Sequence, residues 1–189
     1  MVYGLVLAIV SSLAAGSVVN AQSSLDDFVI TKYGVEMDLG RDNEERSTLR
    51  TTETITADFQ KRNQNRGLER AFVKKYDKHS TSFTLESVTD AQGNKLPHHW
   101  SGDTLRIGEE DVFVFGPKTY KITYTQRDVT RNYADTTKDE FYWDVIGTEW
   151  RVPIEQASQF GVIEIPTPIR SVGDHQATAR LRDDIVATI

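Results

Sequence analysis

The stretch that decides the fold class is Thr48-Leu49-Arg50-Thr51-Thr52-Glu53-Thr54-Ile55-Thr56-Ala57-Asp58-Phe59. Its odd-numbered positions carry every apolar side chain of the stretch, whereas all six even-numbered positions are polar. Side chains of a β-strand alternate between the two faces of a sheet, so this pattern predicts a strand with one face in the core and one in solvent. The many threonines support the same prediction, because β-branched residues favour strands.

The same alternation recurs on both sides of this stretch. Two further segments place large apolar side chains on one face, namely Tyr120, Ile122 and Tyr124 in one and Tyr33, Val35, Met37 and Leu39 in the other. Turn-forming residues separate the runs at 40–43, 90–94, 101–103 and 116–117. Many short strands at this spacing predict an all-β domain over residues 28–166, folded as an antiparallel, immunoglobulin-like β-sandwich.

Composition narrows the class of protein. The chain has 189 residues, with 22 basic and 28 acidic side chains and a formal net charge of −6. This acidic balance argues against nucleic acid as a partner, because binding to phosphates needs a basic surface. The chain contains no cysteine, which excludes a disulfide scaffold, a thiolate metal site and a cysteine nucleophile. Its 3 Trp, 7 Tyr and 8 Phe residues argue against a disordered chain.

The two ends differ from the body of the chain. Residues 1–21 carry no charged side chain and end on Val19-Asn20-Ala21, which is close to the small-x-small pattern at which signal peptidase cleaves. We expect this segment to be an apolar helix that serves as a signal peptide or a membrane anchor. Residues 22–27 would then be a linker to an exported domain. Pro166 and Pro168 end the last predicted strand, so residues 167–189 form a separate C-terminal segment.

The motifs of common enzymes are not found in the sequence. It lacks a P-loop, G-x-G-x-x-G, G-x-S-x-G and H-E-x-x-H. His98 and His99 are adjacent, but neighbouring side chains of a strand point to opposite faces, so a surface position is favoured over a metal site. We therefore expect no catalytic residue, no metal and no cofactor. A hydrolase built on Glu53, Asp139 or Glu140 is the least favoured alternative.

Glu53 departs from the pattern of its own strand. It lies on the apolar face, between Leu49 and Ile55. A buried, ionised carboxylate is costly unless it is paired or hydrogen-bonded. A structural ion pair at the edge of the core is favoured over a catalytic or ligand-binding acid.

The densest aromatic segment is Glu140-Phe141-Tyr142-Trp143-Asp144-Val145-Ile146-Gly147-Thr148-Glu149-Trp150-Arg151-Val152-Pro153-Ile154. Strand parity places Phe141, Trp143 and Val145 on one face, and we expect Trp143 to be the inward anchor. Trp150 and Ile154 should pack on the sheet after a turn at Gly147. Core anchors are favoured over the alternative, a sugar-stacking platform whose candidate residues are Trp100, Tyr142, Trp143 and Trp150.

This segment resembles the signature of the DUF2207 family of predicted bacterial membrane proteins, an aromatic-Trp strand, a short turn and then Trp-x-Val-Pro-Ile. Further pieces follow in the order of the family: Thr52-Glu53-Thr54-Ile55, Gly67-Leu68-Glu69-Arg70, Asp90-Ala91-Gln92-Gly93 and Thr119-Tyr120-Lys121-Ile122-Thr123-Tyr124. Two positions depart from the family pattern, since Glu69 replaces an aromatic residue and Ala71-Phe72-Val73 replaces Asp-Ile-Pro. The resemblance implies an exported N-terminal β-sandwich, tethered by later transmembrane helices that are not present here, so we interpret the chain as truncated.

The resemblance also implies a partner for Glu53 and a general role. It places Arg70 directly after the glycine loop, and we predict that this arginine meets Glu53, with Lys74 and Arg127 as alternative cations. The family implies no established activity. We expect a non-catalytic interaction or structural module at the extracytoplasmic face of the bacterial cytoplasmic membrane, with a protein or cell-envelope glycan as its unknown partner. A carbohydrate-binding module is the alternative.

Overall fold

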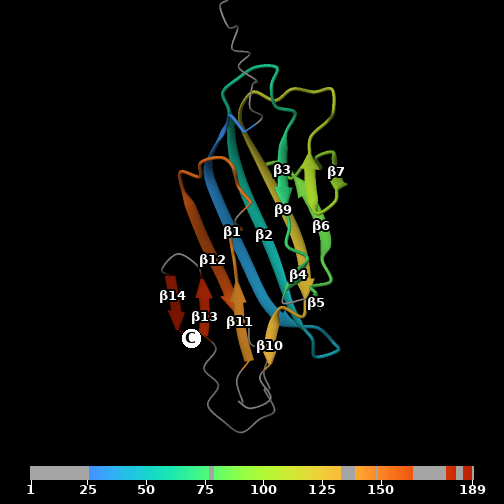
Figure 1. The fold of residues 1–189 in the computed structure, drawn as a ribbon, viewed down its shortest axis with the longest axis vertical. Coiled ribbons are helices and arrows are strands. Elements are labelled where there is room, and N and C mark those ends of the chain that lie inside the picture. The colour runs from blue at the N-terminus through green and yellow to red at the C-terminus, as the bar shows by residue number, and fades with distance from the viewer. Residues whose placement is uncertain are drawn as a thin grey trace, which may run out of the picture.

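The computed structural model describes residues 26–76, 79–132, 139–147, 149–163, 178–181 and 185–188. All regular secondary structure in these ranges is β-strand (Figure 1). The all-β class is therefore confirmed for the described residues. The helix expected for residues 1–21 lies outside them, as does most of the C-terminal segment 167–189. Among the described residues, no helix is long and apolar enough to cross a membrane.

Within the described residues, fourteen strands form four sheets, with five, four, three and two strands. Their bounds are β1 (Val29–Arg41), β2 (Ser47–Phe59), β3 (Leu68–Ala71), β4 (Lys75–Tyr76), β5 (His79–Ser80), β6 (Thr84–Thr89), β7 (His98–Ser101), β8 (Thr104–Ile107), β9 (Gly116–Arg127), β10 (Thr130–Asn132), β11 (Asp139–Trp143), β12 (Ala157–Ile163), β13 (Thr178–Leu181) and β14 (Ile185–Thr188).

The largest sheet has the strand order β12-β1-β2-β9-β6 and is built around the stretch that decides the fold class. β2 pairs antiparallel with β1 on one side and β9 on the other. All six odd-numbered positions from Leu49 to Phe59 are at most 1% exposed. The period of two therefore places this face in the core, including the polar Thr51 and Glu53.

One edge of this sheet corrects the expectation of purely antiparallel pairing. β12 runs parallel to β1, with Tyr33 opposite Ala157 and Leu39 opposite Ile163. The pairing is prepared by the preceding loop, in which the Pro153 carbonyl accepts a hydrogen bond from the Ile30 N–H at 3.0 Å. The sheet is therefore mixed, because its β1–β12 pair is parallel whereas its other pairs are antiparallel. Alternation of apolar residues carries no information on strand direction.

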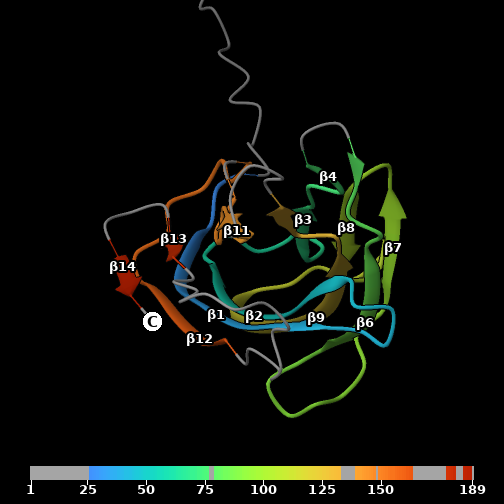
Figure 2. The ribbon, with the colours of Figure 1, turned by 90° about the horizontal axis from the view of Figure 1, so that it is seen from below.

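A second layer covers the inner face of the large sheet. Figure 2 shows β3, β8 and β7, which form a sheet in the order β3-β8-β7, facing β2, β9 and β6. Side chains of both layers meet between them, as in the edge-on contact between Phe72 and Tyr124, whose ring centroids lie 5.0 Å apart. The remaining sheets are β10-β11-β13-β14 and the hairpin β4-β5.

Candidate functional site

The most deeply buried charges in the described residues belong to Glu53 on β2 and Arg70 on β3. The Arg70 Nε and Nη2 atoms donate hydrogen bonds to Glu53 Oε2 at 2.8 Å and Oε1 at 2.9 Å. The side chain of Glu53 is fully buried and that of Arg70 is 7% exposed. This two-pronged geometry is the strongest form of an ion pair between these residue types. The pair joins the two layers, because its members come from different sheets.

The two alternative cations have other partners. Lys74 pairs with Asp103 at 3.3 Å, and Arg127 pairs with Asp42. The structure therefore brings together the two side chains that were expected to meet.

Two tyrosines complete the buried cluster. The Tyr124 hydroxyl donates a hydrogen bond to Glu53 Oε1 at 2.9 Å. The Tyr33 hydroxyl is buried beside the pair, without a hydrogen-bond partner among the described residues. Burial, followed by the negative charge of Glu53, raises the pKa of both tyrosines well above the usual value. Both phenols therefore stay neutral. Burial alone would lower the pKa of Arg70, but the Glu53 charge outweighs it and raises that pKa, so the guanidinium stays charged.

The aromatic segment forms a cover over Arg70. A Cβ atom at Gly147 would lie 3.1 Å from Arg70 Nη1, and Gly147 has a φ of +81°. The Trp150 ring centroid is 5.4 Å from the Arg70 Cζ atom, and the Phe72 ring centroid is 5.0 Å from it. Asp144 holds the turn, since its Oδ1 atom accepts a hydrogen bond from the Gly147 N–H at 3.0 Å. The glycine turn and Trp150 thus shield the charged cluster from water.

Within this segment, burial is distributed differently from the expectation. Phe141 and Val145 are each 8% exposed and form the deeper anchors, whereas Trp143 is half-buried and stacks on Phe141 at 6.1 Å. Trp150 packs edge-on against Tyr33 at 5.8 Å, and Ile154 packs against the core. Trp143 is therefore not the main inward anchor, because the end of β11 lies at the margin of the core.

Trp100 is the remaining sugar-binding candidate whose side chain lies within the described residues. Trp100 on β7 is 38% exposed, but Lys74 Nζ lies 3.8 Å from its ring centroid and the rings of Phe72 and Phe83 meet it edge-on. The side chains of Tyr142, Asp139 and Glu140 lie outside the described residues. His98 and His99 are exposed on β7, and the described residues contain no group of three or more potential metal ligands.

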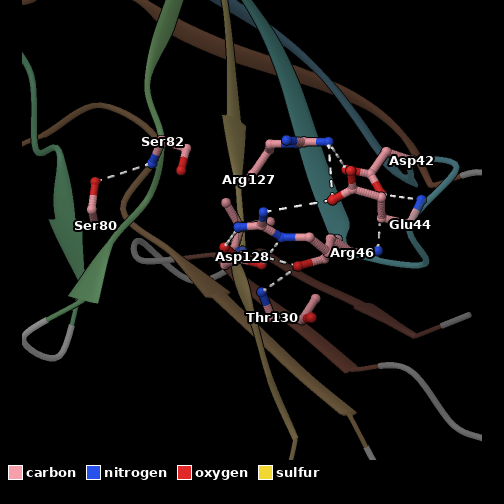
Figure 3. Close-up of polar contacts among 10 residues, drawn as sticks. Asp42, Glu44, Arg46, Ser80, Ser82, Arg127, Asp128 and Thr130 are labelled. Carbon is pink, nitrogen blue, oxygen red and sulfur yellow. Dashed lines mark hydrogen bonds and ion pairs between the residues drawn. The ribbon is translucent and has the colours of Figure 1, made fainter.

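A second charged cluster was not found by reasoning from the sequence. Figure 3 shows Arg127 directed at Asp42 and Glu44, and Arg46 directed at Asp128. The Arg46 Nε atom donates to Asp128 Oδ1 at 3.0 Å. Desolvation acts against ionisation of Asp42, but the N–H groups of Arg46 and Glu44 and the Arg127 guanidinium outweigh it and lower the pKa of that carboxyl. This network fastens the β1–β2 turn to the junction of β9 and β10.

Comparison with protein families shows to which family the chain belongs. The family described as "Predicted membrane protein (DUF2207) N-terminal domain" matches residues 29–181. The chain belongs to the DUF2207 family. The matched range includes Glu53, Arg70, Tyr124, Gly147 and Trp150, so the whole buried cluster lies within the DUF2207 domain. The family description names a predicted membrane protein and gives no activity.

Other comparisons cover only parts of proteins. The large ribosomal subunit protein bL9 of Clavibacter sepedonicus is 74% identical over 27 residues, which is 14% of this chain and 18% of that protein. Two structures of an M1 zinc metallopeptidase from Deinococcus radiodurans match with TM-scores of 0.38 and 0.36 and identities of 9% and 8%. Each match covers 53% of this chain and 20% of the peptidase. Likeness at this level carries no argument about activity.

Proposed function

We propose that the DUF2207 domain of this chain is an immunoglobulin-like β-sandwich that acts as a non-catalytic structural or interaction module. It would be exported and held at the extracytoplasmic face of the bacterial cytoplasmic membrane. The family description supports membrane association. The 21 uncharged residues at the N-terminus support export.

The proposal of a non-catalytic role depends on one observation: both oxygens of the buried Glu53 carboxylate are already hydrogen-bonded. A general acid or base must reach the proton that it transfers. Both oxygens of Glu53 accept hydrogen bonds from Arg70, and Oε1 accepts a further one from Tyr124. The Gly147 turn lies over the guanidinium. A substrate would have to displace this cover and break a buried ion pair before it reached the carboxylate. We therefore assign the cluster a structural role, in which it joins the two layers.

A topology reporter tests export. Alkaline phosphatase, which is active only outside the cytoplasm, is fused after Ile189 in the full chain, and a matched fusion begins at Gln22. We expect phosphatase activity from the full chain and none from the shortened control. Activity of a cytoplasmic reporter such as β-galactosidase at the same position, with an inactive phosphatase, would contradict export.

Glycan binding is the second candidate, and Trp100 is the residue that favours it because part of its ring is exposed. The half-buried Trp143 and Trp150 offer less ring surface for stacking. Titration of the intrinsic tryptophan fluorescence with soluble peptidoglycan fragments tests this function. A saturable change that is lost in Trp100→Ala and kept in Trp143→Phe would favour the glycan-binding role over a purely structural one.

A further inference from the structure

Exposed apolar side chains gather at one end of the domain. Val112, Phe113 and Phe115, in the loop between β8 and β9, are 51%, 41% and 44% exposed. They account for three of the five exposed large hydrophobic residues among those described, the others being Val73 and Trp100. Single exposed apolar residues are ordinary, whereas a local group marks a surface that meets another apolar phase.

Two loops build this end together, and we call residues 61–66 and 112–115 the tip. The Val114 N–H donates a hydrogen bond to the Asn65 carbonyl at 2.8 Å. Arg62 lies over the Phe115 ring at 4.0 Å from its centroid, and Arg66 lies over the Phe113 ring at 4.4 Å. At the base of the tip, the loops approach so closely that a Cβ atom on Gly67 would lie 1.8 Å from the Ile107 carbonyl oxygen. The exposed rings are thus held in a defined arrangement.

The N-terminal end of the described chain lies at the same end of the domain. Asp27 pairs with Lys61 of the tip, and the rings of Phe28 and Phe59 lie 4.9 Å apart. Figure 1 shows these loops together at the upper end of the molecule, where the first strand begins. Residues 22–27 can span at most about 20 Å when fully extended. An apolar segment 1–21 in the bilayer therefore keeps the tip close to the membrane surface.

We propose that the tip inserts into the interfacial layer of the phospholipid bilayer, an inference that rests on the proposed membrane attachment. Val112, Phe113 and Phe115 contact the boundary between headgroups and acyl chains. Arg62 and Arg66 lie at the level of the lipid phosphates, where arginine and aromatic side chains are favourable.

Apolar contact, rather than net charge, drives this insertion. The tip contains three basic side chains, Lys61, Arg62 and Arg66, and the three acidic residues 109–111 directly precede its apolar run. These charges balance, so anionic lipid adds little attraction. We expect insertion into neutral phosphatidylcholine bilayers that changes little with salt.

The absence of cysteine from the chain allows single labels to test this position. The full chain is reconstituted into phosphatidylcholine vesicles with Val112→Cys carrying a nitrobenzoxadiazole label. Asn43→Cys serves as the matched control, because it lies in the turn at the other end of the 13-residue strands β1 and β2, about 40 Å away. We expect a blue shift of the label at 112 and quenching by doxyl-labelled lipid, with neither effect at 43. Thermal melts of both variants check that the fold is kept.

Each other outcome overturns the inference in a recognisable way. If the protein floats with the vesicles but the label at 112 is not quenched, the proposed membrane attachment holds and insertion of the tip is contradicted. If the protein does not float with the vesicles, both membrane attachment and insertion of the tip are contradicted. A blue shift that grows with protein concentration in detergent, without vesicles, assigns the tip to contact between copies of the chain. Quenching that survives Phe113→Ser together with Phe115→Ser shows that the label itself inserts.

Discussion

Gly147 lies against the guanidinium of Arg70, at a distance that leaves no room for a larger residue without movement. A Cβ atom at Gly147 would lie 3.1 Å from Arg70 Nη1. The glycine turn of the aromatic segment and the arginine after the glycine loop, 77 positions apart in the chain, therefore form one contact. Through it, the segment that follows β11 closes over the ion pair that joins β2 and β3.

Gly147→Ala is expected to destabilise the domain more than Gly93→Ala does. Both glycines have positive φ, +81° and +87°, so both variants incur the cost of about 1–2 kcal/mol for an L-residue in the left-handed region. Nothing lies within 4 Å of a Cβ atom at Gly93. The difference between the two free energies of unfolding, measured in urea, isolates the contact with Arg70. Equal losses would contradict a role for the turn as a cover.

Removing one member of the buried pair should be costly. Glu53→Gln leaves the Arg70 guanidinium buried without a counter-charge, and we expect a loss of about 3–5 kcal/mol of unfolding free energy. Glu69→Gln is the matched control, because Glu69 directly precedes Arg70 on β3 and forms an ion pair with Arg106 at 3.0 Å on the exposed surface. The control should lose at most about 1 kcal/mol. Combining Glu53→Gln with Arg70→Met should cost less than the sum of the single changes.

The stability of the domain should fall at alkaline pH through its buried tyrosines. Burial and the Glu53 charge raise the pKa of Tyr33 and Tyr124 in the folded state. These phenols are neutral in both states below pH 10, whereas above it the unfolded chain loses protons that the folded chain keeps. The contribution of these tyrosines to stability is therefore fully present below about pH 10 and is lost as the pH rises further. Absorbance at 295 nm should show that ionisation of these tyrosines coincides with unfolding. Smooth ionisation of all seven tyrosines before unfolding would contradict this prediction.

The charged cluster at the β1–β2 turn should make the stability of the domain fall at acid pH. The pKa of Asp42 is lowered in the folded state, so its contribution to stability is present above its unfolded value near pH 4 and is lost as the pH falls through the folded value. We expect Asp42→Asn to lower the urea midpoint at pH 7 and to narrow its difference from the parent protein at pH 2.5. A difference that stays constant across this range would show that the Asp42 charge contributes nothing.

Within the aromatic segment, Phe141→Ala should destabilise the domain more than Trp143→Ala. Phe141 is 8% exposed, and truncation of a buried aromatic side chain costs about 3–5 kcal/mol. Trp143 is half-buried and stacks on Phe141, so its removal opens a smaller cavity. Chemical denaturation of both variants decides the order. A larger loss for Trp143→Ala would restore Trp143 as the main anchor.

Much of the domain could be predicted from local patterns. The alternation from Leu49 to Phe59 predicted a strand with one buried face, and that face is buried throughout. The same parity placed Glu53 inward, because successive side chains of a strand must point to opposite faces. The motif of the aromatic segment was enough to indicate the DUF2207 family, to which the chain belongs.

Tertiary structure alone decided how these elements meet. The parallel pairing of β12 with β1 could not be predicted, since alternation is the same for a strand that runs in either direction. The contact of Gly147 with Arg70 and that of Arg127 with Asp42 could not be predicted either, because they join segments far apart in the chain. Parity follows from the covalent geometry of each residue and can be read position by position. Contacts of this kind depend on how whole sheets pack, and so they exist only when the chain has folded.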